Sequence, residues 1–204
     1  MVHTIVAAAA IEFAERGYAA TSYGLIADRA GVTKSLVSYH FASKSTVALA
    51  ILQRAFTGGV FMNQAEPARN ALIELIASTK AVASAVVADP VARAAMRLQS
   101  ERGLINGAVP VPFVGWTRRT EETLRAGRRE GLLRDGFDPA EEAYFFIATF
   151  IGLKHMAEAQ GEWNAFPGRA AAGTAARLLL LGASADDLRE HADAGGATGR
   201  PDGD

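Results

Sequence analysis

The sequence lacks cysteine and has few aromatic residues, and its charges nearly cancel. Of its 204 residues none is cysteine, 8% are aromatic, and the formal net charge is -1. The absence of cysteine excludes disulfides, thiolate catalysis and cysteine-ligated zinc or iron–sulfur sites. The balanced charge gives no whole-chain sign of nucleic-acid binding, so a nucleic-acid partner would have to be met by a local patch.

Long hydrophobic runs and a basic leader are also missing. The apolar stretch of residues 76–88 is shorter than the roughly 18 residues that a membrane span needs, and it contains Lys80. At the N-terminus, Glu12 and Glu15 follow directly after a short apolar stretch, which makes a poor signal peptide. We therefore expect a cytoplasmic protein with no membrane partner.

What the sequence does contain is helical periodicity. Half of the residues are hydrophobic, which is enough for a well-formed core. Apolar residues recur at helical spacing, as at Ile5, Ala9 and Phe13, whereas strand-like alternation is scarce. The expected fold class is therefore all-α.

Glycine, proline and hydroxyl residues predict where the helices begin and end. Ser22 and Thr33 are suitable N-caps for two short helices separated by Gly31, and Pro90 can open a helix at its first turn. After these short helices, further helices are expected at residues 44–62, 68–89, 91–102, 116–130, 140–160 and 168–182, with a loop at 103–115.

The two short helices around Gly31 have the length and the turn of a helix-turn-helix, whose second helix enters the major groove of DNA. That helix opens on small and polar residues that can approach the DNA backbone and base edges closely: Thr33, Lys34, Ser35 and Ser38. Local spacing alone leaves a second interpretation equally open, because two short helices with a glycine between them also form plain structural corners.

Three cations lie near this motif. Arg29, Lys34 and Lys44 are expected to form a modest positive patch. Lys44 also opens the next helix, where an ammonium group and free backbone N–H groups are suited to holding a phosphate. Any DNA contact is therefore expected at this end of the chain.

The stretch from Phe13 to Lys44, FAERGYAATSYGLIADRAGVTKSLVSYHFASK, closely resembles the DNA-binding head of the TetR family of transcriptional regulators. FAERGY, the ATS step, IADRAGVTK and YHFxSK follow one another in family order without a gap. The resemblance implies an all-helical homodimer with an N-terminal three-helix head and a variable C-terminal ligand-binding domain. Such a protein is usually a repressor that a small molecule releases from DNA.

The same resemblance implies roles for individual residues of the head. It places Thr33, Lys34, Ser35, Leu36 and Ser38 on the recognition helix, Tyr39 and His40 beside the sugar-phosphate backbone, and Phe41 in the core. We add Thr21, Ser22 and Lys44 to the expected DNA contacts. Ser35 and Ser38 depart from the glycine and the tyrosine that are frequent at these positions, which bears on DNA affinity and register.

A second resemblance covers residues 113–158, which are similar to the γ-butyrolactone-type autoregulator receptors of the same family. A tryptophan, Trp116, opens a helix, and the segments GLLRDGFDPAEEA and FIGLKH follow in the order seen in those receptors. The resemblance implies that the Trp116 indole stacks on a lactone or furan ring. The other interpretation is that Trp116 is a core anchor that covers the preceding loop.

An effector of this kind requires an apolar wall with a few polar groups. We expect the wall to come from Phe113, Phe146 and Phe150, and hydrogen bonds to come from Gln99 and Thr149.

The expected organisation has a helix-turn-helix domain at residues 1–45, a ligand-binding and dimerisation domain at 46–183 and a disordered tail at 184–204. The helices at 140–160 and 168–182 carry more apolar surface than one core needs. We therefore expect them to pair with their copies as a four-helix bundle.

No catalytic, metal or cofactor site is expected. His155 and Glu158 lie three apart on one helix, but no second such pair completes a metal ligand set. The arginines between Trp116 and Glu130 alternate with glutamates at helical pair spacing, which favours a solvated face. The protein is therefore not expected to be an enzyme.

The leading hypothesis is a homodimeric repressor that binds a pseudo-palindromic double-stranded operator and is released by a small apolar effector such as a γ-butyrolactone. One alternative is a TetR-type regulator that responds to an antibiotic or another metabolite. Another is a ligand carrier or enzyme domain with a remnant helix-turn-helix.

Overall fold

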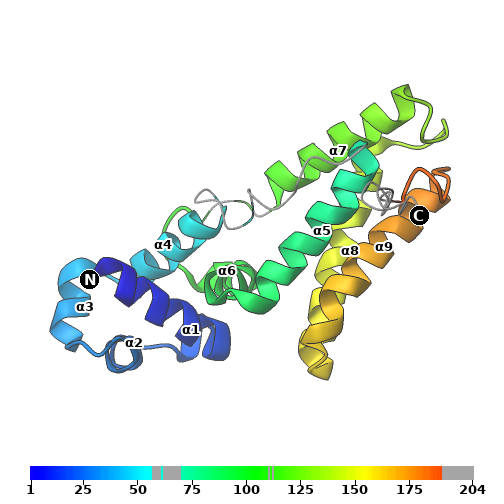
Figure 1. The fold of residues 1–204 in the computed structure, drawn as a ribbon. Helices are drawn as coiled ribbons and strands as arrows, with labels where there is room; N and C mark the ends of the chain where they lie inside the picture. The colour runs from blue at the N-terminus through cyan, green and yellow to red at the C-terminus, as the bar shows by residue number, and fades with distance from the viewer. Residues whose placement is uncertain (57–60, 62–69, 110, 112, 190–204) are drawn as a thin grey trace, which may run out of the picture.

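The computed structural model describes residues 1–56, 61, 70–109, 111 and 113–189. All regular elements in these ranges are helices, as the periodicity predicts, and they form an elongated molecule with α1 to α4 at one end and α8 and α9 at the other (Figure 1). The expected end of the fourth helix, near Met62, and the last part of the expected tail, residues 190–204, lie outside the described residues.

Four helices form the N-terminal end: α1 (Val2–Ala20), α2 (Tyr23–Ala30), α3 (Lys34–His40) and α4 (Lys44–Phe56). The predicted caps hold α2 and α3. Ser22 Oγ accepts a hydrogen bond from the Leu25 amide at 3.3 Å, and Thr33 Oγ1 accepts one from the Leu36 amide at 3.2 Å. Gly31 ends α2 at φ 66°, a left-handed conformation that glycine adopts without strain.

The second half of the chain contains the remaining helices: α5 (Ala71–Ala88), α6 (Pro90–Ser100), η1 (Arg102–Leu104), α7 (Val114–Arg129), α8 (Pro139–Gln160), η2 (Trp163–Ala165) and α9 (Phe166–Leu180). Every predicted helix is present, but several boundaries differ. Helix α6 ends at Ser100 rather than at residue 102, α9 ends at Leu180 rather than at residue 182, and the expected start of α5, at residue 68, lies outside the described residues. Helix α7 begins at Val114 rather than at Trp116, and α9 begins at Phe166 rather than at residue 168.

The N-terminal helices share one hydrophobic core with α6. Ile5, Phe13, Ile26 and Val37 from α1, α2 and α3 are fully buried in this core together with Leu98 of α6. Helix α6 therefore joins the first helices to the rest of the protein. The domain boundary at residue 45 stays a prediction, because the core extends past it into α4 and α6.

Two further apolar clusters lie among α5, α7, α8 and α9. Leu72, Leu124 and Leu178 are buried in one of them, and Phe150 and Phe166 are buried in the other, nearer to α6. Figure 1 shows α8 and α9 side by side at the outer end of the molecule. Each of the two helices has buried residues, such as Phe150 and Leu178, and exposed ones, such as Tyr144 and Leu180.

Helix α5 is long and apolar enough to cross a membrane by length and composition, and 39% of it is buried inside the protein. It packs against α6, α7 and α9. A core helix of a globular domain has the same length and composition.

Candidate functional site

The helix-turn-helix presents the predicted recognition residues on its outer side. Lys34, Ser35 and Ser38 of α3 are exposed, and Tyr39 is 83% exposed. Val37, on the opposite side of α3, is fully buried in the core. The structure thus brings the predicted residues to one free surface over a packed support.

Leu36 and His40 are half-buried at the edges of this surface, and Thr33 is exposed at its start. The end of α3 is fixed by Tyr23, whose hydroxyl donates a 2.6 Å hydrogen bond to the Phe41 carbonyl. Burial raises the pKa of the Tyr23 hydroxyl. Phe41 itself is buried, as the resemblance implies.

The two predicted residues at the start of α2 lie in different surroundings. Thr21 is 2% exposed, and its hydroxyl donates a 2.7 Å hydrogen bond to the Gly17 carbonyl. Ser22 is exposed and caps α2. We therefore remove Thr21 from the expected DNA contacts, because its side chain faces the interior and its hydroxyl is already used.

Two of the three cations of the expected patch are engaged within the protein. The Lys44 ammonium donates hydrogen bonds to the Tyr18, Ala19 and Thr21 carbonyls, at 2.6, 3.3 and 2.8 Å. Burial lowers the pKa of this ammonium, while the charge of Glu101 opposes that shift. Lys44 thus closes the end of α1, a role that sequence reasoning missed when it assigned the side chain to a phosphate.

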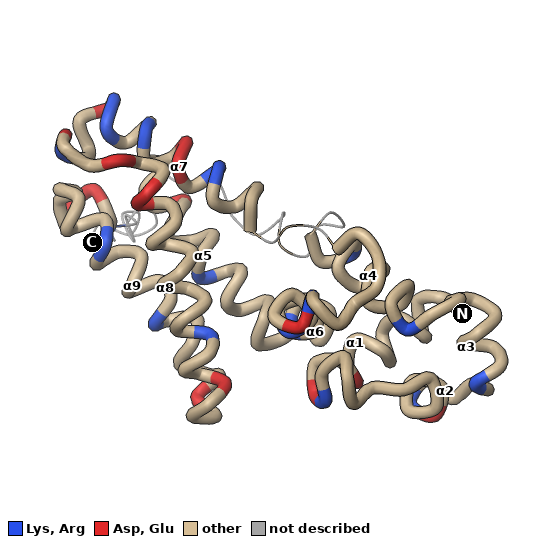
Figure 2. Tube along the Cα trace, turned by 180° about the vertical axis from the view of Figure 1, so that it is seen from behind, with Lys and Arg blue, Asp and Glu red and all other residues tan. Residues whose placement is uncertain are grey.

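Arg29 is engaged as well, because it bridges α2 to Glu12 and Glu15 of α1 at 2.5 and 2.8 Å. Those carboxylates raise the pKa of the Arg29 guanidinium. Figure 2 shows that basic residues are sparse over these helices and mixed with acids along α7. The predicted positive patch is therefore reduced to Lys34, which has no ion pair among the described residues.

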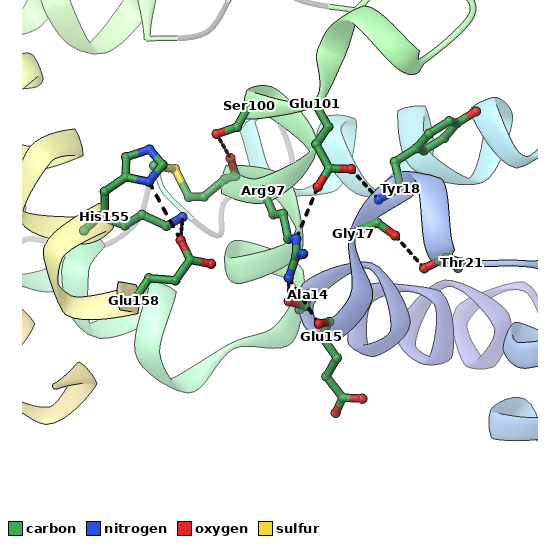
Figure 3. A network of polar contacts seen from close by, with 12 residues as sticks. Ala14, Glu15, Gly17, Tyr18, Thr21, Arg97, Ser100, Glu101, His155 and Glu158 are labelled. Carbon is green, nitrogen blue, oxygen red and sulfur yellow. Dashed lines mark hydrogen bonds and ion pairs between the residues drawn. The ribbon is translucent and has the colours of Figure 1, made fainter. Parts of the chain in front are cut away.

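A polar junction joins α1 to α6 (Figure 3). Gly17 interrupts α1 at φ 80° and ψ 176°, which frees the next amide. That amide, of Tyr18, donates a 2.6 Å hydrogen bond to Glu101 at the end of α6. Arg97 donates to the Ala14 and Glu15 carbonyls, both at 3.1 Å, and to Glu101 at 3.2 Å. Helix α6 therefore holds the kinked end of α1 with charged groups.

The other side of α6 lines a cavity of about 160 Å³. Helix α8 lines the opposite wall, and Phe113, just before α7, completes it. The lining residues are Met96, Gln99, Ser100, Phe113, Ile151, Lys154 and His155. Gln99 and Phe113 were predicted as effector contacts, and the cavity brings them together.

The remaining predicted effector residues lie outside this cavity lining. Trp116 packs edge-on against Phe150 with ring centroids 4.8 Å apart, and it lies 6.5 Å from Phe113. Phe146 and Thr149 line a much smaller space against α9. Phe150 belongs to both groups, because it contacts Trp116 and also lines the smaller space together with Phe146 and Thr149.

Lys154 also lines this cavity and was not predicted from the sequence, where only His155 and Glu158 were considered, as candidate metal ligands. In the structure the His155 Nδ1 atom lies 3.9 Å from Glu158, whereas the Lys154 ammonium lies 2.6 Å from it. A lysine inside an otherwise apolar helical stretch was the signal that could have identified this position.

Residues 5–51 match the family described as bacterial regulatory proteins, tetR family. The A-factor receptor protein of Streptomyces griseus is 32% identical over 156 residues, which are 76% of this chain and 54% of the receptor. The chain therefore spans about half the length of that relative.

Solved structures match over a larger part of their length. A structure described as the molecular basis for control of antibiotic production by bacterial hormones is 30% identical, with a TM-score of 0.73, and the match covers 88% of this chain and 96% of that one. A γ-butyrolactone receptor described as ArpA-like is 26% identical, with a TM-score of 0.64 and coverage of 87% and 96%. These matches extend from the head through the helices around the cavity.

Proposed function

Because the chain belongs to the TetR family of bacterial regulatory proteins and resembles the γ-butyrolactone receptors within it, we propose that it is a transcriptional repressor that a small effector releases from operator DNA. The observation that carries this proposal is the position of α6. One side of α6 holds the end of α1, next to the helix-turn-helix, and the other side lines a cavity.

The DNA contacts that we propose are the exposed residues of α3 and the residues that flank it. Lys34 would contact a phosphate, Ser35 and Ser38 would approach base edges, and Tyr39 would lie along the backbone. Ser22, Thr33, Leu36 and His40 complete the proposed set. Two subunits would place their α3 helices in successive major grooves of a pseudo-palindromic operator, roughly 34 Å apart.

The proposed dimer face is the outward side of α8 and α9. It exposes several large apolar side chains that a soluble monomer would keep covered. These are Tyr144, Phe145, Met156, Leu179 and Leu180. Pairing of α8 and α9 with their copies would bury this surface in a four-helix bundle and hold the two α3 helices at a fixed spacing.

Release of DNA requires that the effector bind better to one arrangement of the subunits than to the other. An effector in the cavity would contact Met96, Gln99 and Ser100 on α6. A shift of α6 would then act on α1 through Arg97 and Glu101. We therefore propose that α6 is the element whose position both the effector and the DNA influence.

Two other assignments have less support. A response to an antibiotic or another metabolite needs only a different effector in the same cavity, so the effector series described in the Discussion tests it. For an enzyme or a ligand carrier with a remnant helix-turn-helix, the exposed surface of α3 would have no use. We place the protein in the cytoplasm, where its proposed operator lies, and we assign it no cofactor.

Substitutions of Lys34 and Lys44, the two lysines of the head, distinguish a residue that contacts DNA from one that supports the fold. Lys34→Ala is expected to weaken DNA binding roughly tenfold and to lower the salt slope of binding by about 2 for a dimer, since each subunit loses one phosphate contact. Lys44→Met is expected to leave the salt slope unchanged and to lower the free energy of unfolding by about 1–3 kcal/mol, since three carbonyls lose their donor.

Fluorescence anisotropy across a salt series, together with urea unfolding, measures both effects. An unchanged slope in Lys34→Ala would remove Lys34 from the proposed interface. A reduced slope in Lys44→Met would indicate that Lys44 contacts a phosphate, as the sequence predicts.

A further inference from the structure

Lys154 places a cation in the wall of the cavity. Its side chain is 4% exposed, although lysine is among the residues that folding proteins bury least. Gln99, Ser100 and His155 lie in the same lining. The cavity therefore has one polar, cationic region.

The partner of this cation lies nearer to the solvent. Glu158 binds the Lys154 ammonium at 2.6 Å, but its own side chain is 39% exposed. A buried ammonium needs a paired anion, whereas a half-exposed carboxylate can turn into water at little cost. The cation is thus fixed at the cavity, and the anion that neutralises it is exchangeable.

The helical spacing of Lys154 and Glu158 does not explain why Lys154 lines the cavity. Lys154 and Glu158 are spaced i, i+4 on α8, and such a pair forms equally well with both side chains on the surface. Here the lysine faces the cavity side of α8 instead. Formation of the ion pair therefore does not require the lysine to line the cavity.

The rest of the lining is apolar. Met96, Phe113 and Ile151 are its apolar members. The volume of about 160 Å³ is close to that of apolar cavities, roughly 150 Å³, that hold a single benzene ring. The cavity therefore suits a ligand with a ring or a short acyl chain at one end and an anionic group at the other.

We propose that the effector of this protein is a small amphipathic carboxylic acid whose carboxylate replaces Glu158 on the Lys154 ammonium. This proposal rests on the proposed function, because it names the chemical class of the effector. Lys154 would donate to the carboxylate, and Ser100 and His155, which line the same cavity, would bind a second oxygen. A neutral lactone lacks the charge that would release Glu158.

A lactone and its ring-opened acid test this proposal directly, because they share one carbon skeleton and differ in charge. The probes are γ-octalactone and 4-hydroxyoctanoate, titrated into the full chain by calorimetry at neutral pH. We expect the acid to bind at least about tenfold more tightly than the lactone. Equal binding, or tighter binding of the lactone, would overturn the proposal.

Two variants test whether the Lys154–Glu158 ion pair causes the difference in affinity between the acid and the lactone. Lys154→Met, which keeps the length and the apolar stem of the side chain, is expected to weaken binding of the acid at least about tenfold and to leave lactone binding unchanged. Glu158→Gln removes the competing carboxylate and is expected to strengthen binding of the acid. Equal losses for both probes in Lys154→Met, or weaker acid binding in Glu158→Gln, would contradict the proposed exchange.

The test also separates this inference from the proposed function. If the acid binds through Lys154 and DNA is not released, the carboxylate site stands and the repressor mechanism fails. If the lactone releases DNA and the acid does not bind, the repressor mechanism stands and the carboxylate site fails.

Discussion

Gly17→Ala is expected to lower the free energy of unfolding by about 3 kcal/mol, through strain of about 1–3 kcal/mol and the loss of a charge-assisted hydrogen bond worth about 1.5–3 kcal/mol. Gly17 has φ 80° and ψ 176°, a conformation that side chains rarely adopt. A Cβ atom at this position would lie 2.4 Å from Glu101 Oε1 and 3.0 Å from Arg97 Nε. The substitution would therefore push Glu101 away from the Tyr18 amide.

Gly24→Ala is the matched control for this change. A Cβ atom on Gly24, which is in helical α2, meets only Ser22 Oγ at an ordinary distance of 3.6 Å. Alanine is a better helix former than glycine by about 1 kcal/mol, so Gly24→Ala should be neutral or stabilising. Urea unfolding of both variants measures the difference. If Gly17→Ala were as stable as Gly24→Ala, the junction between α1 and α6 would not have the structural role described above.

Leu180→Glu is expected to convert the protein to a monomer and to weaken operator binding by about 100-fold or more, because two linked heads bind far more tightly than one. Leu180 is 71% exposed on α9, within the proposed dimer face. A buried carboxylate without a partner in the bundle would cost more than the lost apolar contact. Analytical ultracentrifugation measures the association, and fluorescence anisotropy measures the DNA affinity.

Leu104→Glu is the control for a carboxylate at an exposed leucine. Leu104 is 55% exposed on η1, which lies outside the proposed dimer face. This variant is expected to remain a dimer and to bind DNA as the unchanged protein does. A dimeric Leu180→Glu protein would show that the subunits pair through another surface.

Elements defined by local chemistry were predictable from the sequence. Ser22 and Thr33 cap the helices that they were expected to cap, and Pro90 opens α6. Helix α7 was placed too late because its N-cap is Phe113, at φ 64° and without a side-chain hydrogen bond to the helix. An aromatic residue in this conformation follows no capping rule.

The partners of the long cations were not predictable in the same way. Lys44 and Arg29 reach α1 from α4 and α2, over sequence separations of 26 and 17 residues at their hydrogen bonds to Tyr18 and Glu12. Such contacts depend on how the helices pack, and the same side chains could equally well have extended into solvent. The charged side chains could therefore be identified from the sequence, but the groups that they contact could not.

The cavity was only partly predictable for the same reason. It forms where α6 and α8 face each other, so it joins Gln99 to residues that lie far along the chain. Phe146 and Phe150 are one helical turn apart and line one small space together, but that space lies against α9 and not in the cavity that contains Gln99 and Phe113. Helical spacing predicts which residues share a face of the helix. Which cavity that face borders depends on how the neighbouring helices pack.

The central claim is that binding of a small effector releases this protein from DNA. The most direct test is fluorescence anisotropy of the full chain with labelled DNA from upstream of its own gene, in the presence and absence of γ-butyrolactones, related furans and their ring-opened acids. We predict specific, salt-dependent binding that one compound of this series abolishes. Specific binding that persists against every compound, or no preference for this DNA over a scrambled fragment, would contradict the account.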